Sequence, residues 1–297
     1  MDDKIAIKEP KAHGDAMLPL TVYHNKYTAK LSSNREVVYC HWHEEVEFVY
    51  FLKGNATFYI NMEPVQISSG QAVLVNSEAI HSAKSPDDSD CDYYAIVFKF
   101  DMLSSHSFDS CQSKYIDPLL KKYYEFPLFV SGSLEWEKNI LIQLQDLIHA
   151  YEEKKPGYEL IIKASLYRIF ACLFAEGQLV PRDKSSLWVN QYKVNQLKKV
   201  LNYIQDNYHK KIMIKELASV INMSPNHFCS FFKANTGRSP MDYIIQYRID
   251  KAAAILAKED RKIFDIAMDV GFENFSYFIK KFKEYKDCTP SNYRNQI

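Results

Sequence analysis

The chain has 297 residues, which is enough for two domains of ordinary size. Hydrophobic residues make up 47% and charged residues 25% of it, and these values exclude a disordered or fibrous chain. No apolar stretch approaches the roughly 20 residues of a membrane span, and residues 1–10 lack the apolar core of a secretion signal. The six cysteines are scattered without a C-x-x-C pair, which argues against a zinc ribbon or a disulfide scaffold. We therefore expect a cytoplasmic protein with no membrane partner.

The formal net charge of zero conceals an uneven distribution. Residues 190–297 contain 18 Lys and Arg against 11 Asp and Glu, a net charge of +7. Residues 1–189 contain 19 against 26, a net charge of −7. A basic third joined to an acidic body suggests a separate module that binds a polyanion, of which nucleic acid is the commonest.

Residues 21–100 contain short runs rich in β-branched and aromatic residues, separated by turn residues. Many short strands at near-regular spacing are typical of a β-sandwich or a small β-barrel. The runs are Val37–Tyr39, Phe48–Phe51, Ala56–Ile60, Ala72–Val75 and Tyr93–Phe100.

The hydrophobic period becomes helical after about residue 110. Ile140–Tyr151 has one apolar face, and Tyr158–Ala175 is apolar on most sides. A helix as apolar as the second is buried, either within the monomer or in a dimer interface. The stretch Gly177–Ser186 then combines Gly, Pro, charges and serines, which favours a domain boundary there.

An internal repeat follows this boundary. Ala218 and Asn222 match Ala267 and Gly271 at an offset of 49 residues. The offset then becomes 50, so that one residue has been inserted. The later matches are Phe228 with Phe278, Phe232 with Phe282, Lys233 with Lys283, Pro240 with Pro290, and Tyr243 with Tyr293. The last third is therefore a duplicated helical unit.

Each copy reads as a helix-turn-helix. In the first copy the turn falls at Asn222, a residue type that tolerates left-handed backbone, and in the second it falls at Gly271. Ser224 is placed to cap the helix after the first turn, whereas Met213 stands where a capping side chain is expected. A helix over Met241–Lys258 connects the copies and spans about 27 Å, against about 34 Å between successive major-groove turns.

Several motifs in this region are specific. They are Ile263-x-Asp265-Ile266-Ala267-x-x-Val270-Gly271-Phe272, Phe278-x-x-x-Phe282-Lys283, Thr289-Pro290-Ser291-x-Tyr293-Arg294, Phe232-Lys233 and Gly237-x-Ser239-Pro240-x-x-Tyr243. With them, residues 192–294 resemble the DNA-binding domain of AraC/XylS-type transcription regulators over its full length. The resemblance implies that the second helix of each copy enters the major groove of double-stranded DNA.

The resemblance also implies which side chains contact DNA. The positions that match the base-contacting positions of the family are Asn226, Cys229 and Ser230 in the first copy and Phe275, Ser276, Ile279 and Lys280 in the second. Phe275 or Ile279 suits contact with a thymine methyl group. Lys233 also faces outward, and Lys280, Lys281 and Lys283 suit phosphate contacts, which give affinity without sequence specificity.

The β-rich region carries the spacing His41-x-His43-x-x-x-Glu47-x6-Gly54, and a later strand-turn segment ends at His81. Residues 41, 43 and 47 would share one face of a single strand, because side chains alternate. This pattern resembles the cupin fold over residues 38–98, and in particular the cupin sensor domains of AraC-type regulators.

Three interpretations of His41, His43, Glu47 and His81 remain open: a small-molecule site without metal, which we favour, a metal site, and a structural cluster. The positions match the three His and one Glu that bind Fe, Mn, Ni or Zn in metal-dependent cupin enzymes. The sequence departs from that enzyme pattern before His81, because Asn76–Ile80 replaces the usual Pro-x-Gly. Trp42 alternates to the opposite face and is expected to pack.

The sequence thus predicts an α+β protein of two domains. A cupin-like β-barrel occupies residues 20–110, a helical dimerisation segment 111–178, a linker 179–190, and an all-α domain with two helix-turn-helix units 191–297. We expect a transcription regulator, by family tendency an activator, that forms a homodimer, contacts RNA polymerase and responds to a small molecule, with sugars favoured by resemblance. No enzymatic activity, cofactor or metal is expected. The alternative is a metal-dependent cupin enzyme fused to a DNA-binding domain.

Overall fold

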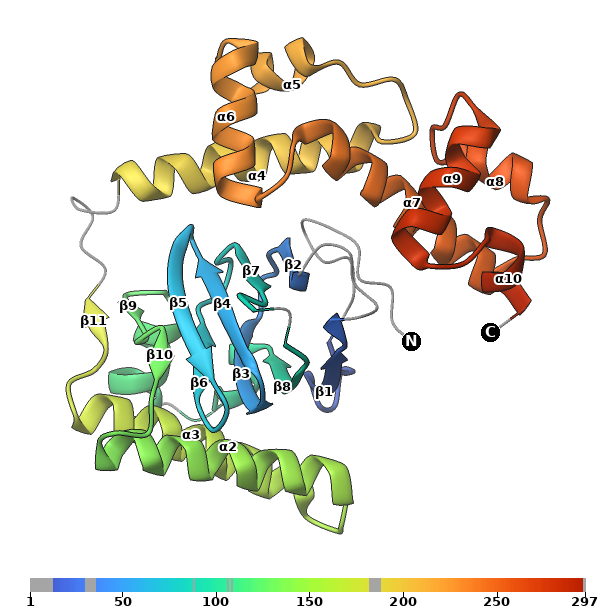
Figure 1. Cartoon of the computed structure of the whole chain (residues 1–297). Helices are drawn as coiled ribbons and strands as arrows, with labels where there is room; N and C mark the ends of the chain where they lie inside the picture. The colour runs from blue at the N-terminus through green and yellow to red at the C-terminus, as the bar shows by residue number, and fades with distance from the viewer. Residues whose placement is uncertain are drawn as a thin grey trace.

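The computed structural model describes residues 13–29, 36–87, 89–105, 107, 109–181 and 188–295, without the side chains of residues 188–191. It has the predicted α+β architecture, with a β-rich domain up to residue 181 followed by a helical domain (Figure 1). Over the described ranges, no helix combines the length and the apolar character that crossing a membrane requires.

Two antiparallel sheets form the β-rich domain. The five-stranded sheet has the order β1-β8-β3-β6-β10, and the four-stranded sheet has the order β2-β7-β4-β5. Buried side chains of both sheets, such as Phe51 and Phe58, share one core cluster, so the sheets pack face to face. The strands are β1 (Leu20–Tyr27), β2 (Glu36–His41), β3 (Val46–Lys53), β4 (Asn55–Ile60), β5 (Glu63–Ser68), β6 (Ala72–Val75), β7 (His81–Lys84), β8 (Cys91–Phe98) and β10 (Phe129–Val130).

The five predicted runs correspond to β2, β3, β4, β6 and β8. Two of the remaining strands, β5 and β7, lacked a usable hydrophobic signal. Most of β5 is exposed and it contains Pro64, whereas β7 has only four residues, His-Ser-Ala-Lys. These strands form because their neighbours in the sheet supply hydrogen-bonding partners, and a local pattern does not record that.

Helices α2 (Glu135–Glu153) and α3 (Tyr158–Ala175) match the two predicted helices and lie together along one side of the β-rich domain (Figure 1). Their buried residues share a core cluster with β1, β3, β6 and β8. The predicted helical segment of residues 111–178 also contains β10, which joins the larger sheet, and both helices complete the core of that sheet. Short turns of helix precede them: η2 (Phe100–Leu103), η3 (Gln112–Ile116) and α1 (Asp117–Leu120).

The helical domain consists of two small bundles joined by one long helix (Figure 1). Each bundle has its own core, built around Phe228 and Phe232 in the first and Phe278 and Phe282 in the second. The equivalence of these phenylalanines is the repeat seen in the sequence. The helices are α4 (Trp188–Asn207), α5 (Ile214–Val220), α6 (Pro225–Thr236), α7 (Pro240–Lys258), α8 (Ile263–Asp269), α9 (Phe275–Lys286) and α10 (Pro290–Asn295).

Two parts of the predicted linker, residues 179–190, belong to regular secondary structure. Its first part forms β11 (Val180–Pro181), which pairs with β9 (Tyr124–Glu125), and α4 has already begun at Trp188. The residues between 181 and 188 lie outside the described part of the chain.

Both predicted turns adopt the left-handed backbone that the helix-turn-helix geometry needs. The φ angle is 53° at Asn222 and 93° at Gly271. A Cβ atom at Gly271 would lie 2.6 Å from the carbonyl oxygen of Tyr208, so glycine is required there for space as well as for conformation. At the start of α5, the carboxylate of Glu216 accepts a hydrogen bond from the backbone N–H of Met213 at 3.0 Å, which partly replaces the missing side-chain cap.

Candidate functional site

The first candidate site is the exposed face of α6. Phe228 and Phe232 are fully buried and fix which side of the helix faces the bundle. Among the predicted DNA-contacting residues, Asn226, Ser230 and Lys233 are exposed, and Cys229 is half-buried. Phe231 is half-buried at the edge of the same core.

Helix α9 repeats this arrangement in the second unit. Ser276, Lys280 and Lys283 are exposed. Phe275 and Ile279 pack partly on the core of their bundle, so each presents only an edge of its side chain. The ammonium of Lys281 lies 2.9 Å from the carboxylate of Glu284, which makes it less available for DNA than its neighbours.

The second candidate site, here called the histidine cluster, consists of His41, His43, Glu47 and His81. One ligand atom from each residue lies within 4.8 Å of the others. Exposed fractions are 2% for His43, 5% for Glu47 and 1% for His81. Burial would raise the pKa of Glu47, but the imidazoles of His81 and His43 hold it well below its usual value, so the residue is a carboxylate.

The sequence pattern correctly predicted that these four residues lie close together, but the expected single strand was wrong. His41 ends β2, His43 lies in the connection after it, and Glu47 belongs to β3 of the other sheet. They converge because the connection folds between the two sheets, and because β7 pairs with β2 so that His81 lies opposite His41. A single strand face does not hold them.

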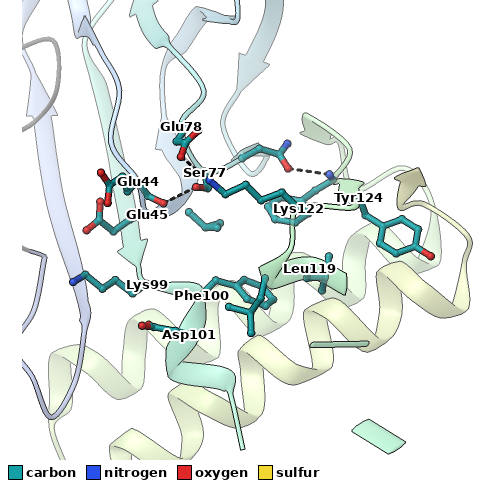
Figure 2. Close-up of a pocket in the computed structure, with 14 residues that line it drawn as sticks. Glu44, Glu45, Ser77, Glu78, Lys99, Phe100, Asp101, Leu119, Lys122 and Tyr124 are labelled. Atoms are coloured by element: carbon teal, nitrogen blue, oxygen red, sulfur yellow. Dashed lines mark hydrogen bonds and ion pairs between the residues drawn. The ribbon is translucent and has the colours of Figure 1, made fainter. Parts of the chain in front are cut away.

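A third candidate site is a pocket of about 330 Å³ beside this connection (Figure 2). It lies between the β2–β3 connection, the β6–β7 connection and the segment after β8, and the histidine cluster does not line it. Charged and aromatic side chains meet in it. Its lining includes Glu44, Glu45, Glu78, Lys99, Phe100, Asp101, Lys122, Tyr124 and Phe126.

Lys122 and Glu78 form an ion pair across this pocket, with Nζ 2.6 Å from Oε1. Both residues have left-handed backbone, with φ of 56° and 64°. The hydroxyl of Ser77 donates to the carbonyl oxygen of Glu44 at 2.6 Å and so ties the two connections together (Figure 2). The pocket was not predicted from the sequence, because its walls come from segments that are far apart in the chain and carry no motif.

The β-rich domain and the first helical bundle share an interface. Cys40 and Ile80 are buried in the core cluster of α4–α7, and Trp42 packs against it. Trp42 was expected to pack, and it does so against the other domain, with the ammonium of Lys198 4.2 Å from its ring centre. Lys198 also donates a hydrogen bond to the carbonyl oxygen of Glu78 at 2.6 Å.

A nearly buried ion pair also lies in the interface between the two domains. Arg238, which follows α6, places Nε 2.6 Å from Oε1 of Glu36 at the start of β2. Burial raises the pKa of the Glu36 carboxyl, and the Arg238 guanidinium partly offsets this. Arg238 also hydrogen-bonds Gln246 of α7. Neither Glu36 nor Arg238 was singled out from the sequence, because they are 202 positions apart.

Two comparisons with family models fit this architecture. A model described as a helix-turn-helix domain matches residues 217–296, and a model described as an AraC-like ligand-binding domain matches residues 33–170. An uncharacterized HTH-type transcriptional regulator, YdeC of Bacillus subtilis (strain 168), is 30% identical over 289 residues, which cover 97% of this chain and 96% of that protein. The resemblance inferred from the sequence is thereby confirmed for both domains.

Two further similarities cover parts of the chain. The raffinose operon transcriptional regulatory protein RafR of Pediococcus pentosaceus is 27% identical over 179 residues, 57% of this chain and 62% of that protein. Among solved structures, the C-terminal domain of the two-component response regulator yesN from Fusobacterium nucleatum is 35% identical. It covers 34% of this chain and 98% of that one, with a TM-score of 0.33.

The exposed face of α9 predicts a salt-dependent contribution to DNA affinity. Lys283→Ala should weaken binding to a mixed-sequence duplex and lower the slope of log affinity against log salt by about 1 per bound chain, because one fewer phosphate is neutralised. Fluorescence anisotropy between 50 and 200 mM NaCl measures both quantities. Lys53→Ala, which removes an exposed lysine from the β-rich domain, is the matched control. An unchanged slope in Lys283→Ala would show that this lysine is not at the DNA.

Proposed function

We propose that this chain, which belongs to the AraC family of helix-turn-helix transcription regulators, binds a small carbohydrate. The contact between its two domains would transmit this binding to the DNA-binding domain. One observation carries the proposal. The connection between β6 and β7 lines the sensor pocket with Ser77 and Glu78 and contacts the first DNA-binding bundle with Glu78 and Ile80. Because this regulator acts on DNA, we place it in the cytoplasm, and its output is transcription rather than catalysis.

On the DNA side, α6 and α9 are proposed as the two recognition helices. The residues proposed to contact bases or phosphates are Asn226, Cys229, Ser230, Lys233, Phe275, Ser276, Ile279, Lys280 and Lys283. Helix α7 has 19 residues, which correspond to about 28 Å, so the helices it separates fit successive major-groove turns. Half-buried Phe275 and Ile279 suit thymine methyl groups, whereas exposed lysines suit phosphates.

On the sensor side, the pocket in Figure 2 suits a polar, ring-shaped effector. Its carboxylates and lysines are partners for hydroxyl groups, and Phe100 and Tyr124 supply aromatic surface. Its volume of about 330 Å³ lies at the lower end of small-molecule sites. The name of RafR, a regulator of a raffinose operon, supports a carbohydrate as the effector class.

The sequence favoured the histidine cluster as the effector site, and that role stays a prediction. Its donor atoms lie within 4.8 Å of one another, and three of its four residues are buried. A sugar ring does not fit between atoms this close. We therefore assign the organic effector to the neighbouring pocket.

Homodimer formation, RNA polymerase contact and activation belong to the same proposal. Helices α2 and α3 bury most of their apolar side chains within the monomer, yet Ile142, Leu160 and Ile161 remain exposed, Leu160 by 74%. Exposed apolar residues on adjacent helices favour an interface with a second copy. Light scattering should give the mass of two chains for the wild type and of one chain for Ile161→Glu. A monomeric wild type would remove the dimer from the proposal.

The effector site is tested by thermal shift against a panel of mono- and disaccharides. A sugar at 100 times its Kd stabilises the folded state by about 2.7 kcal/mol. Lys122→Met, which breaks the ion pair to Glu78, should weaken that sugar at least tenfold, or about 1.4 kcal/mol. Lys138→Met removes a similar exposed ion pair, to Glu135 on α2, and should bind as the wild type does. Absence of any shift, or an equal shift in Lys122→Met, would contradict the assignment.

The domain contact is tested by breaking its ion pair. Arg238→Met leaves the Glu36 carboxylate nearly buried without its partner, which should cost about 3 kcal/mol in urea unfolding. It should also speed amide hydrogen exchange in β2. Arg261→Met, which removes an exposed ion pair to Asp269 within the second bundle, should cost less than about 1 kcal/mol.

Adding Glu36→Gln to Arg238→Met should recover part of the loss, because the uncompensated charge disappears. If Arg238→Met behaves like Arg261→Met, the two domains are not joined at this pair.

A further inference from the structure

The two helix-turn-helix units contact each other directly as well as through α7. Residues 208–211, between α4 and α5, form a loop of the first unit, and residues 271–273, between α8 and α9, form the turn of the second. Tyr208 packs against the core clusters of both units. A Cβ atom at Gly271 would lie 2.6 Å from the carbonyl oxygen of Tyr208, so the two backbones approach closely. The loop of the first unit therefore lies against the turn that precedes α9.

Arg248 on α7 lies at this contact. Its neighbour Tyr247 belongs to the core of the first unit and its neighbour Ile249 to the core of the second, so Arg248 marks the boundary between them. Its Nε donates to the carbonyl oxygen of Tyr208 at 2.8 Å, and its Nη2 donates to the carbonyl oxygen of Lys210 at 2.6 Å. These carbonyls follow the end of α4, where a cationic donor is favoured.

The same guanidinium faces the second unit. Its central carbon lies 5.9 Å from the ring centre of Phe272, a buried residue of the turn. A Cβ atom at Gly271 would lie 3.0 Å from Nε of Arg248. Burial lowers the pKa of the Arg248 guanidinium, and the carboxylate of Glu273, also in the turn, partly offsets this. One side chain thus contacts the loop of one unit and the turn of the other.

We propose that Arg248 is a positioning residue for DNA recognition, which fixes α9 relative to α6 so that the chain accepts a single separation of two DNA half-sites. The inference rests on the proposed role of α6 and α9 as recognition helices. One added base pair moves a half-site by about 3.4 Å along the duplex and turns it by about 35°. A planar group with two donors and an aromatic contact fixes orientation as well as distance, so the units cannot follow that change.

The contact is tested first without DNA, by amide hydrogen exchange on the full chain. The N–H groups of Lys210 and Phe272 are both hydrogen-bonded to backbone carbonyls, one on each side of the contact. Arg248→Met should speed exchange at both by at least about tenfold, because both segments lose the guanidinium. A residue that only capped α4 would affect Lys210 alone. Unchanged exchange at Phe272 would therefore overturn the coupling between units.

The separation of half-sites is tested on a duplex that the wild-type chain selects from a randomised pool, with footprinting to locate the two half-sites. Fluorescence anisotropy compares this duplex with versions that carry one or two added base pairs between the half-sites. We expect one added base pair to weaken the wild type by at least about tenfold and Arg248→Met by less than about threefold. Arg248→Met should bind the selected duplex itself more weakly, because fewer molecules hold the arrangement that fits it.

Two further variants separate position from charge. Lys251→Met removes a cation about one turn further along α7, where its ammonium lies 5.4 Å from the ring centre of Tyr247 on the same helix. It should keep the wild-type preference for spacing. Arg248→Lys keeps the charge but lacks the planar fork, so it should follow Arg248→Met.

Equal spacing preference in the wild type and Arg248→Met, or loss of the preference in Lys251→Met, would overturn the positioning role. A single footprint on the selected duplex would contradict the proposed pair of recognition helices, and with it the fixed separation. The exchange result at Phe272 would then still decide whether Arg248 joins the two units, so the two failures are distinguishable.

Discussion

Residues 76–81, which run from the end of β6 to the first residue of β7, constrain the rest of the molecule. Asn76 is buried, and its side-chain oxygen accepts a hydrogen bond from the backbone N–H of Phe126 at 3.2 Å. Glu78 has left-handed backbone, which lets it meet Lys122 through its side chain and Lys198 through its carbonyl oxygen. His81, the last residue of this segment, belongs to the histidine cluster. A shift of this segment cannot leave the pocket, the cluster and the domain contact all unchanged.

The uneven charge of the chain serves the contact between domains as well as DNA. Arg238 and Lys198 belong to the basic third, but the guanidinium of Arg238 pairs with the carboxylate of Glu36 in the acidic domain, and Lys198 donates to the backbone carbonyl oxygen of Glu78. Part of the net charge of +7 is thus neutralised inside the molecule. The lysines on the outer faces of α6 and α9 stay exposed and are the ones proposed to contact phosphates. Charge asymmetry alone therefore overstates the positive surface available to nucleic acid, because some cations form interdomain pairs.

The sequence predicted best what depends on local pattern. The duplication, the turns at Asn222 and Gly271 and the paired phenylalanines located both helix-turn-helix units, since each element there is fixed by nearby residues. Histidine spacing found the cluster, although the assumed single strand was wrong. The pocket and the pair of Glu36 with Arg238 were not found, because they join distant segments by tertiary packing and leave no period or motif in the chain.

An effector alters DNA binding only if it favours one domain arrangement over another. Moving a two-state equilibrium from 1:99 to 99:1 takes about 5.5 kcal/mol of differential binding. The contact between the two domains is small enough for such an energy to alter it. It includes the nearly buried ion pair of Arg238 with Glu36, the cation–π contact of Lys198 with Trp42, and apolar side chains such as Cys40 and Ile80. A ligand that competes for the Glu78 carboxylate acts directly on the segment that Lys198 holds. Under the proposed function, such a ligand would act on the domain contact at Lys198, in the middle of α4, and would not require a change inside the bundles.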